Sequence, residues 1–343
     1  LHAFTARRRE LDHHRLMRVD TPLVEQLRQR AQAHIDALGV IEAVDAEQVV
    51  VLAGAQCALY AVAQCLLNPG DEVIVAEPMY VTYEAVFGAC GARVVPVPVR
   101  PEHGFRVQAA DVAALITPRT RAIALNSPHN PSGAMFGADD IAALADLLRD
   151  TDIVLLSDEV YEHIVFDGAR HESILRHPEL RDRAFVVSSF GKTYHCTGWK
   201  LGYCIAPPAL SAEFRKVHQY NVFCTFAPAQ HAFASMLREA PEHDEQLGAF
   251  YQAKRDAFAA QLATTRLEAL PVPGGYFQLV DYSAVSDLDD AAFCRWLTIE
   301  KGVAAIPLSP FYAQPPAGQR LARLCFAKNP ATLDAAIARL QAL

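Results

Sequence analysis

The sequence lacks the patterns that mark most metal-binding and nucleic-acid-binding proteins. None of its eight cysteines belongs to a C-x-x-C pair, and its 13 histidines include no H-E-x-x-H pattern, so no zinc site is indicated. Acidic residues outnumber basic ones, and the net charge of −8 gives no electrostatic reason to expect a nucleic acid or an anionic membrane as partner. Scattered cysteines favour buried free thiols in a reducing cytoplasm.

The longest uncharged stretch does not have the character of a membrane span. Residues 48–70 carry no charged side chain, but they include Gly54, Gln56, Gln64, Asn68 and Pro69. A β-branched run is followed there by an Ala/Leu-rich run, and a buried strand leading into a buried helix explains this better than a transmembrane helix does. No signal peptide and no low-complexity segment is visible. We therefore expect a soluble, globular protein.

Short apolar runs alternate with helical patterns through the first two thirds of the chain. The helical patterns include residues 56–67 and 139–148. The apolar runs read as buried strands, and they are residues 48–52, 72–76, 93–97, 122–125, 153–157, 184–188 and 202–206. This alternation predicts an α/β domain whose mostly parallel sheet has helices on both faces.

The last third of the chain has a different pattern. Long helical stretches cover residues 209–218 and 243–264, and they are followed by shorter strands near 275–281 and 323–326 and a closing helix over 330–343. A chain of 343 residues is long enough for two domains. We predict a large domain over residues 24–245 and a smaller α+β domain made of residues 1–23 and 246–343.

The carboxyl ends of the predicted strands are where a ligand would bind in an open α/β sheet. After the first strand, Ala53-Gly54-Ala55-Gln56 opens a helix, and small residues there let the backbone N–H groups approach a phosphate. A simple tight turn is the other interpretation. Tyr80 follows the second strand, where it can stack on a planar ring or pack in the core.

Three more strand ends carry residues whose side chains could take part in a reaction. Asn130 lies in a Pro/Asn/Gly-rich segment, which by itself would be only a turn. Asp158 follows apolar strand residues, where a buried acid needs a cation as partner. Lys192 lies in a Ser/Gly-rich turn and is a candidate covalent amine. For any one of these residues a structural role is the simpler interpretation, but together and in this order they indicate one active site.

At these residues the chain resembles the class I/II aminotransferases, which are enzymes of fold type I that depend on pyridoxal 5′-phosphate (PLP). The resemblance covers roughly residues 24–343 and rests on the stretches NSPHNPSG (126–133), SDEVY (157–161) and SSFGKTYHCTGWKLGY (188–203). From about residue 126 onward, HIVFDG, FYQAKRD, IPLSPFY and RLCFAK are most similar to methionine aminotransferases and glutamine/kynurenine transaminases. Residues 48–100 look more like arginine–pyruvate transaminases.

The resemblance implies a role for each site residue. Lys192 would form a Schiff base with PLP and later act as a general base, while Asp158 would keep the pyridine nitrogen protonated. Arg323, with Asn130, would bind the α-carboxylate of the substrate. Among the cofactor contacts, Tyr161 and Asn130 would bind the phenolic oxygen, and Tyr80 would stack on the ring. The phosphate would be held by Gly54, Ala55, Gln56, Ser189 and Lys200.

The resemblance further implies an amino acid and a 2-oxo acid as substrates, with methionine-like, glutamine or aromatic side chains favoured, and a homodimer. A PLP-dependent C–S lyase on the same fold is an alternative, since it would need the same Lys192 and Asp158. A PLP-binding regulatory module would require a DNA-binding domain that the sequence does not show. Relatives have several dozen more residues before the phosphate loop, which predicts either a break between about Leu16 and Leu23 or a site open on one side.

Overall fold

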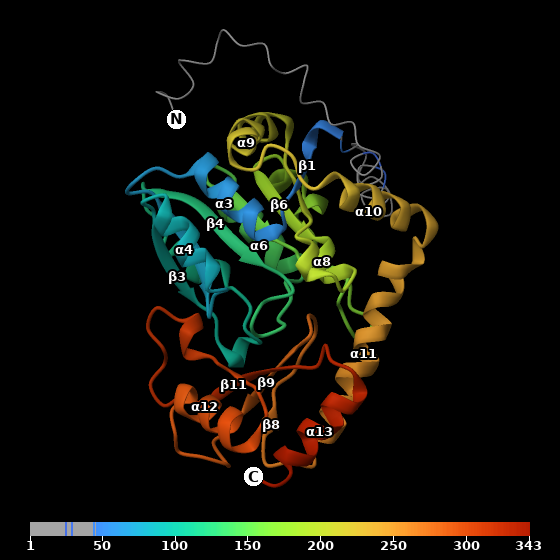
Figure 1. Ribbon diagram of the computed structural model, residues 1–343. Coiled ribbons are helices and arrows are strands. Elements are labelled where there is room, and N and C mark those ends of the chain that lie inside the picture. The colour runs from blue at the N-terminus through green and yellow to red at the C-terminus, as the bar shows by residue number, and fades with distance from the viewer. Residues whose placement is uncertain (1–24, 26–28, 30–43, 45) are drawn as a thin grey trace.

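The computed structural model describes Glu25, Gln29, Val44 and residues 46–343. The expected break between Leu16 and Leu23, and the assignment of residues 1–23 to the small domain, lie outside the described residues. Figure 1 shows an upper part built around a large sheet and a lower part built around a small one, with the long helix α11 (Glu242–Leu262) running along one side between them. We call these parts the large lobe and the small lobe.

The larger sheet is mostly parallel, as the sequence predicts. Within residues 46–343 it has seven strands in the order β1-β7-β6-β5-β4-β2-β3, and β7 alone runs antiparallel to its neighbours β1 and β6. The strands are β1 (Val49–Leu52), β2 (Glu72–Glu77), β3 (Arg93–Pro98), β4 (Thr120–Asn126), β5 (Val154–Asp158), β6 (Ala184–Ser189) and β7 (Gly202–Ile205). This arrangement agrees with the mostly parallel sheet that the sequence predicts.

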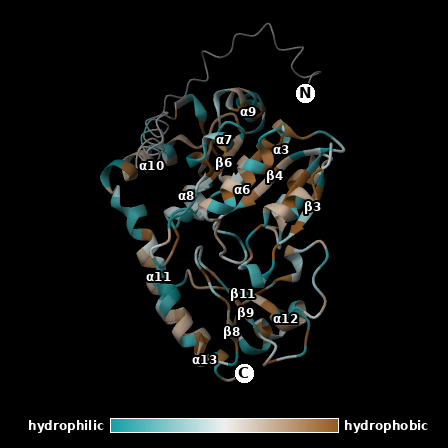
Figure 2. Cartoon of the chain, turned by 180° about the vertical axis from the view of Figure 1, so that it is seen from behind, coloured by the Kyte–Doolittle hydropathy of each residue, from teal (hydrophilic) through white to brown (hydrophobic). Residues whose placement is uncertain are grey.

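Both faces of this sheet are buried, which explains why its strands are apolar throughout. Along β1, Val49 and Val51 pack on one face, whereas Val50 and Leu52 pack on the other, because successive side chains of a strand point in opposite directions. Figure 2 shows hydrophobic residues along the central strands and along α3. Helices α3 (Ala55–Leu66), α4 (Thr82–Ala89) and α9 (Pro208–Asn221) cover one face. The other face is covered by α5 (Ala109–Ala113), α6 (Ala138–Leu148), α7 (Pro178–Arg181) and α10 (Ala227–Glu239).

The small lobe is an antiparallel sheet backed by helices. Its strand order is β10-β11-β9-β8, and the strands are β8 (Glu268–Ala269), β9 (Phe277–Asp281), β10 (Ile306–Pro307) and β11 (Leu321–Cys325). Helix α12 (Asp290–Lys301) starts at an Asp289 cap that accepts a hydrogen bond from the Ala292 N–H, and it ends at Gly302 in the left-handed conformation, so local signals set both of its ends. An Asn329 cap and Pro330 begin the closing helix α13 (Pro330–Leu340).

The segment after β5 joins the two lobes. Val160, Tyr161, Ile164 and Phe166 leave the large sheet and pack into the apolar core of the small lobe. This stretch carries the SDEVY pattern, so the residues that follow Asp158 are fixed by both lobes. The domain boundary near residue 245 stays a prediction. Among the helices in the described part of the chain, none has the length and apolar character that a membrane crossing requires.

Candidate active site

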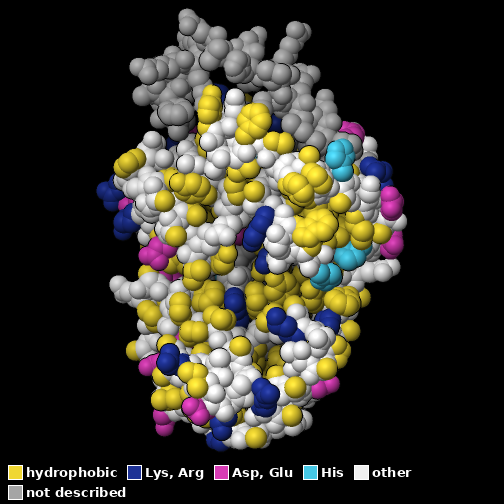
Figure 3. Space-filling model, viewed as in Figure 1, with side chains coloured by type: hydrophobic (Ala, Val, Ile, Leu, Met, Phe, Trp, Pro, Cys, Tyr) yellow, Lys and Arg dark blue, Asp and Glu magenta, His cyan; other side chains and the backbone are white. Residues whose placement is uncertain are grey.

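Strands β2, β4, β5 and β6 run parallel and therefore end at one edge of the large sheet. Asn126, at the end of β4, lies beside Asp158, at the end of β5, and Asp158 lies beside Val187 of β6. The segments that carry Tyr80, Asn130 and Lys192 follow these strands directly. Figure 3 shows the surface hollowed between the lobes at this level, with hydrophobic and Lys/Arg side chains around the hollow.

Asp158 is a buried carboxylate without a cation of its own. Its Oδ2 accepts a 2.8 Å hydrogen bond from the Tyr83 hydroxyl, and its Oδ1 lies 3.4 Å from the Val160 N–H. Burial raises the pKa of Asp158 to about 6, although both hydrogen bonds act to lower it. In the part of the chain that the structure describes, no ion pair joins it to a basic side chain. A protonated pyridine nitrogen would supply the missing positive charge, so this donor set fits PLP.

Lys192 lies on the single-turn helix α8 (Phe190–Thr193), directly after β6. Its Nζ donates a 3.1 Å hydrogen bond to the hydroxyl of Tyr276 and lies 5.6 Å from the ring centre of Tyr161. Burial raises the pKa of Tyr161 well above its ordinary value, so at neutral pH its hydroxyl is a protonated donor. An amine and a phenol thus lie together at the strand ends.

Arg323, on strand β11 of the small lobe, also lies at this site. Its Nη1 donates a 2.6 Å hydrogen bond to Asn130 Oδ1, and its guanidinium stacks 3.9 Å from the ring centre of Phe277 and 5.2 Å from that of Phe311. Burial lowers its pKa, and among residues 46–343 no carboxylate forms an ion pair with it. A partly buried guanidinium without an acid is suited to bind the carboxylate of a ligand.

The expected phosphate-binding residues come together at the start of α3. Gly54 has φ 85°, and a Cβ there would lie 3.7 Å from the Lys200 backbone. Gly202 is paired with Ser189, and a Cβ on Gly202 would lie only 3.0 Å from the Ala55 nitrogen. The first turn of α3, the end of β6 and Lys200 are therefore neighbours, an arrangement that fits a phosphate at a helix N-terminus. Both Gln56 and Lys200 are exposed.

Sequence reasoning missed three aromatic residues of the site. Tyr83 is the hydrogen-bond partner of Asp158, and Tyr276 is the hydrogen-bond partner of Lys192. The Phe277 ring stacks against the Arg323 guanidinium. Tyr80, which was expected to stack on the cofactor, lies half-buried and edge-on to Tyr83 at 5.7 Å. The pair Tyr276-Phe277 follows two glycines at the start of a strand. Glycines there often mark a place where another backbone or a ligand comes close, and this signal could have identified the pair.

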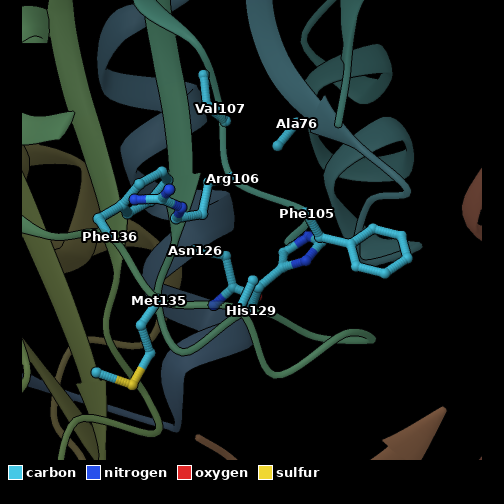
Figure 4. Close-up of a pocket in the computed structure, with 9 residues that line it drawn as sticks. Ala76, Phe105, Arg106, Val107, Asn126, His129, Met135 and Phe136 are labelled. Atoms are coloured by element: carbon cyan, nitrogen blue, oxygen red, sulfur yellow. The ribbon is translucent and has the colours of Figure 1, made fainter. Parts of the chain in front are cut away.

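A buried histidine supports the loop that carries Asn130. His129 Nδ1 lies 2.7 Å from Ser132 Oγ, and its Nε2 lies 2.9 Å from the Pro78 carbonyl. Burial lowers the pKa of His129 to about 4, so the ring is neutral. Figure 4 shows Asn126 and His129 at a small cavity on this side of the loop. Its volume of about 10 Å³ is at the lower limit for one water molecule, so it cannot hold a substrate.

Comparison with known proteins shows which family the chain belongs to. The family model described as "Aminotransferase class I and II" matches residues 4–340. The chain is 53% identical over 295 residues to the methionine aminotransferase of Escherichia coli strain K12, which covers 86% of this chain and 76% of that protein. It is 51% identical over 282 residues to the arginine–pyruvate transaminase of Pseudomonas aeruginosa, covering 82% of this chain and 71% of that protein.

The solved structures that superimpose well on this chain are also described as aminotransferases. An Escherichia coli protein described as having a methionine aminotransferase function superimposes with a TM-score of 0.89 at 50% sequence identity, over 94% of this chain and 84% of that one. The N-succinyldiaminopimelate aminotransferase of Mycobacterium tuberculosis superimposes with a TM-score of 0.87 at 36% identity, over 94% and 83% of the two chains.

Proposed function

The chain belongs to the class I and II aminotransferases and is therefore a PLP-dependent aminotransferase, and from this we propose that it acts on methionine and similar L-amino acids, with Lys192 as its essential amine. The 2-oxo acid of the donor is released, and a second 2-oxo acid receives the amino group. The relatives compared above are named as aminotransferases, which favours this reaction over the two alternatives, a C–S lyase and a regulatory module.

When bound, PLP supplies an aldehyde for the substrate amine and a ring that withdraws electrons from the substrate Cα. Lys192 would hold the cofactor through its Nζ, and its free amine would take the proton from the substrate Cα. Asp158 holds a proton on the pyridine nitrogen, because its buried carboxylate is stabilised by a positive charge there. Tyr161 and Asn130 would donate hydrogen bonds to the phenolic oxygen, and Tyr80 would cover the ring face.

We assign the phosphate to the first turn of α3. The N–H groups of Ala55 and Gln56 point out of the helix, and Gly54 allows a close approach because it has no side chain. Ser189 contributes a hydroxyl, and Lys200 contributes a positive charge as a point donor without the planar fork of an arginine. The adjacency of these segments supports the assignment.

The substrate preference is supported by the aromatic surroundings of Arg323. Phe277 and Phe311 flank its guanidinium, and Tyr276 lies next to Phe277, with ring centres 4.7 Å apart. Such walls favour an apolar or aromatic side chain over a charged one, because a charge would lose its hydration there. The relative named for methionine agrees with this preference, whereas the relative named for arginine does not.

The observation that carries the proposal is the Arg323 guanidinium, which has an amide partner but no acid in the described chain. Arg323→Ala should raise KM for methionine by the equivalent of about 2–5 kcal/mol, the loss expected when one member of a buried charge pair is removed, and should leave PLP binding intact. Arg320→Ala is the matched control, because Arg320 pairs with the exposed Asp287 and should change KM little. Equal KM values for the two variants would place the carboxylate elsewhere.

We further propose that the enzyme is a homodimer that acts in the cytoplasm. Tyr220, Phe223, Trp199 and Phe226 are exposed aromatics, and the last two line a surface depression at η5 (Thr197–Trp199) and the start of α10. Exposed apolar surface of this kind is typical of a protein interface. The eight cysteines are free thiols, which suits a reducing compartment.

A further inference from the structure

Tyr276 reaches the active site from the small lobe because two glycine contacts allow it. A Cβ on Gly274 would lie 2.8 Å from the Pro128 ring, and one on Gly133 would lie 2.6 Å from the Gly274 carbonyl oxygen. Any side chain at either position would push the segment before β9 away from the Asn130 loop. The two glycines therefore let the small-lobe backbone lie against the large lobe, and this places Tyr276 opposite Lys192.

The Tyr276 hydroxyl is held on two sides. It accepts a hydrogen bond from Lys192 Nζ at 3.1 Å, and the Tyr161 side chain lies beside it. Its ring packs edge-on against Tyr161, with centres 5.2 Å apart, and lies 5.8 Å from the Tyr251 ring. These contacts leave the hydroxyl little freedom, and within the described residues no acidic side chain forms an ion pair with Lys192.

We propose that the free Lys192 amine is hydrogen-bonded to the Tyr276 hydroxyl before it reacts, and that this bond holds the amine in place for proton transfer. The inference rests on the assignment of Lys192 as the essential amine. A free lysine side chain has several rotatable bonds, and fixing it costs conformational entropy. A fixed acceptor offsets part of that cost and keeps Nζ among the strand ends, where the substrate Cα must lie to react.

The contact also joins the two lobes. Lys192 belongs to the large lobe and Tyr276 to the small lobe, so the hydrogen bond forms only when the lobes are as close as they are in this structure. Tyr276 is thus a positioning residue for Lys192, and its effect is predicted to lie on the proton-transfer step rather than on substrate binding.

The first test measures the amine directly in the apoprotein. Cyanate reacts with neutral amines, and mass spectrometry reports its rate of reaction at Lys192 relative to the exposed Lys328. Tyr276→Phe should increase this relative rate about tenfold, equivalent to ~1.4 kcal/mol, because one hydrogen bond from the amine is lost. Tyr282→Phe is the control, since its hydroxyl is bonded to the Leu288 carbonyl and not to the site; it should leave the relative rate unchanged. An unchanged rate in Tyr276→Phe overturns the proposal.

The second test uses the PLP-loaded enzyme. Tyr276→Phe should lower kcat for methionine about tenfold with KM within about twofold of the wild-type value, and its circular dichroism should match the wild type. A raised KM with unchanged kcat would overturn the proposal, because Tyr276 would then contact the substrate rather than the lysine. If Lys192→Ala retains turnover, the assignment of the essential amine fails, while the labelling experiment still measures the contact itself.

Discussion

At the scale of single residues, two adjacent buried carboxylates have opposite electrostatic surroundings. Asp158 forms no ion pair with a basic side chain in the described residues, and burial raises its pKa to about 6 although the nearby Lys192 acts to lower it. Glu159 lies 2.8 Å from His171 Nε2 and accepts hydrogen bonds from Ser157 and the Ile174 N–H. Burial acts to raise the pKa of Glu159, but His171 and these bonds lower it overall. Glu159 already has its countercharge, whereas Asp158 requires one from a ligand.

Asp158→Asn should therefore stabilise the apoprotein while impairing the enzyme. The folded-state pKa of about 6 lies above the ordinary aspartate value of 3.8, so the ionised carboxylate costs stability above pH 6, and the cost disappears as the pH falls towards 4. The two-unit difference corresponds to roughly 3 kcal/mol. Urea unfolding of the apoprotein at pH 8 and pH 5 should show this gain shrinking at the lower pH. Turnover with PLP should fall about 10² or more, because a transition-state charge is lost.

Glu159→Gln is the matched control for that prediction. It removes a buried carboxylate one residue away, yet it should destabilise the apoprotein at neutral pH by about 1–3 kcal/mol, because the hydrogen-bonded pair with His171 is lost and burial then favours the neutral His171 ring. If both variants shift stability in the same direction, burial alone rather than the presence of a partner decides the effect.

Local sequence predicted the residues that follow strands, and it could not predict contacts across lobes. Asp158 and Lys192 were found because each follows an apolar run, and that signal spans only a few residues. The Arg323–Asn130 hydrogen bond joins side chains 193 positions apart, and the Lys192–Tyr276 bond joins side chains 84 apart. Both depend on how the small lobe lies against the large one, which no local pattern records.

At the scale of secondary structure, the strands of the large sheet were predicted to within about two residues, because buried strands are continuous apolar runs. Helix α10 was missed. Its Phe226 N-cap makes no side-chain hydrogen bond, and Pro228 lies in its first turn, so the capping signal is absent and proline reads as a break. Helix α8 has four residues, too few to show a helical period.

A glycine pair tests how the elements around Asn130 are held. Gly133→Ala should cost more stability than Gly168→Ala. Both glycines have positive φ, at 77° and 70°, so both variants incur the left-handed penalty of about 1–2 kcal/mol. A Cβ on Gly133 would also meet the Gly274 oxygen at 2.6 Å, whereas a Cβ on Gly168 would meet nothing within 4 Å. Thermal unfolding should rank the variants, and only Gly133→Ala should lower turnover. Equal losses of stability in the two variants would mean that the loop moves to accommodate the added methyl group at no further cost.

At the scale of the whole molecule, exposed aromatic surface leads us to expect self-association. Trp199 is 55% exposed and Phe226 is 68% exposed, and η5, which carries Trp199, immediately precedes Lys200 of the proposed phosphate site. Sedimentation at micromolar concentration should give a dimer, and Phe226→Asp should shift it towards monomer, because a charge in an apolar interface costs several kcal/mol. Val81→Asp, at another exposed apolar residue, is the control. A monomeric wild-type protein would contradict the homodimer.

The central claim, an aminotransferase that works through Lys192, is tested most directly by one half-reaction. The PLP-loaded protein is mixed with L-methionine without any acceptor acid, and the visible absorbance and the released 2-oxo acid are followed together. We predict that the visible band disappears, that one equivalent of 2-oxo acid forms per active site, and that an added 2-oxo acid restores the band. Lys192→Ala should do none of this. Continuous release of 2-oxo acid without an acceptor, or an unchanged time course in Lys192→Ala, would contradict the account.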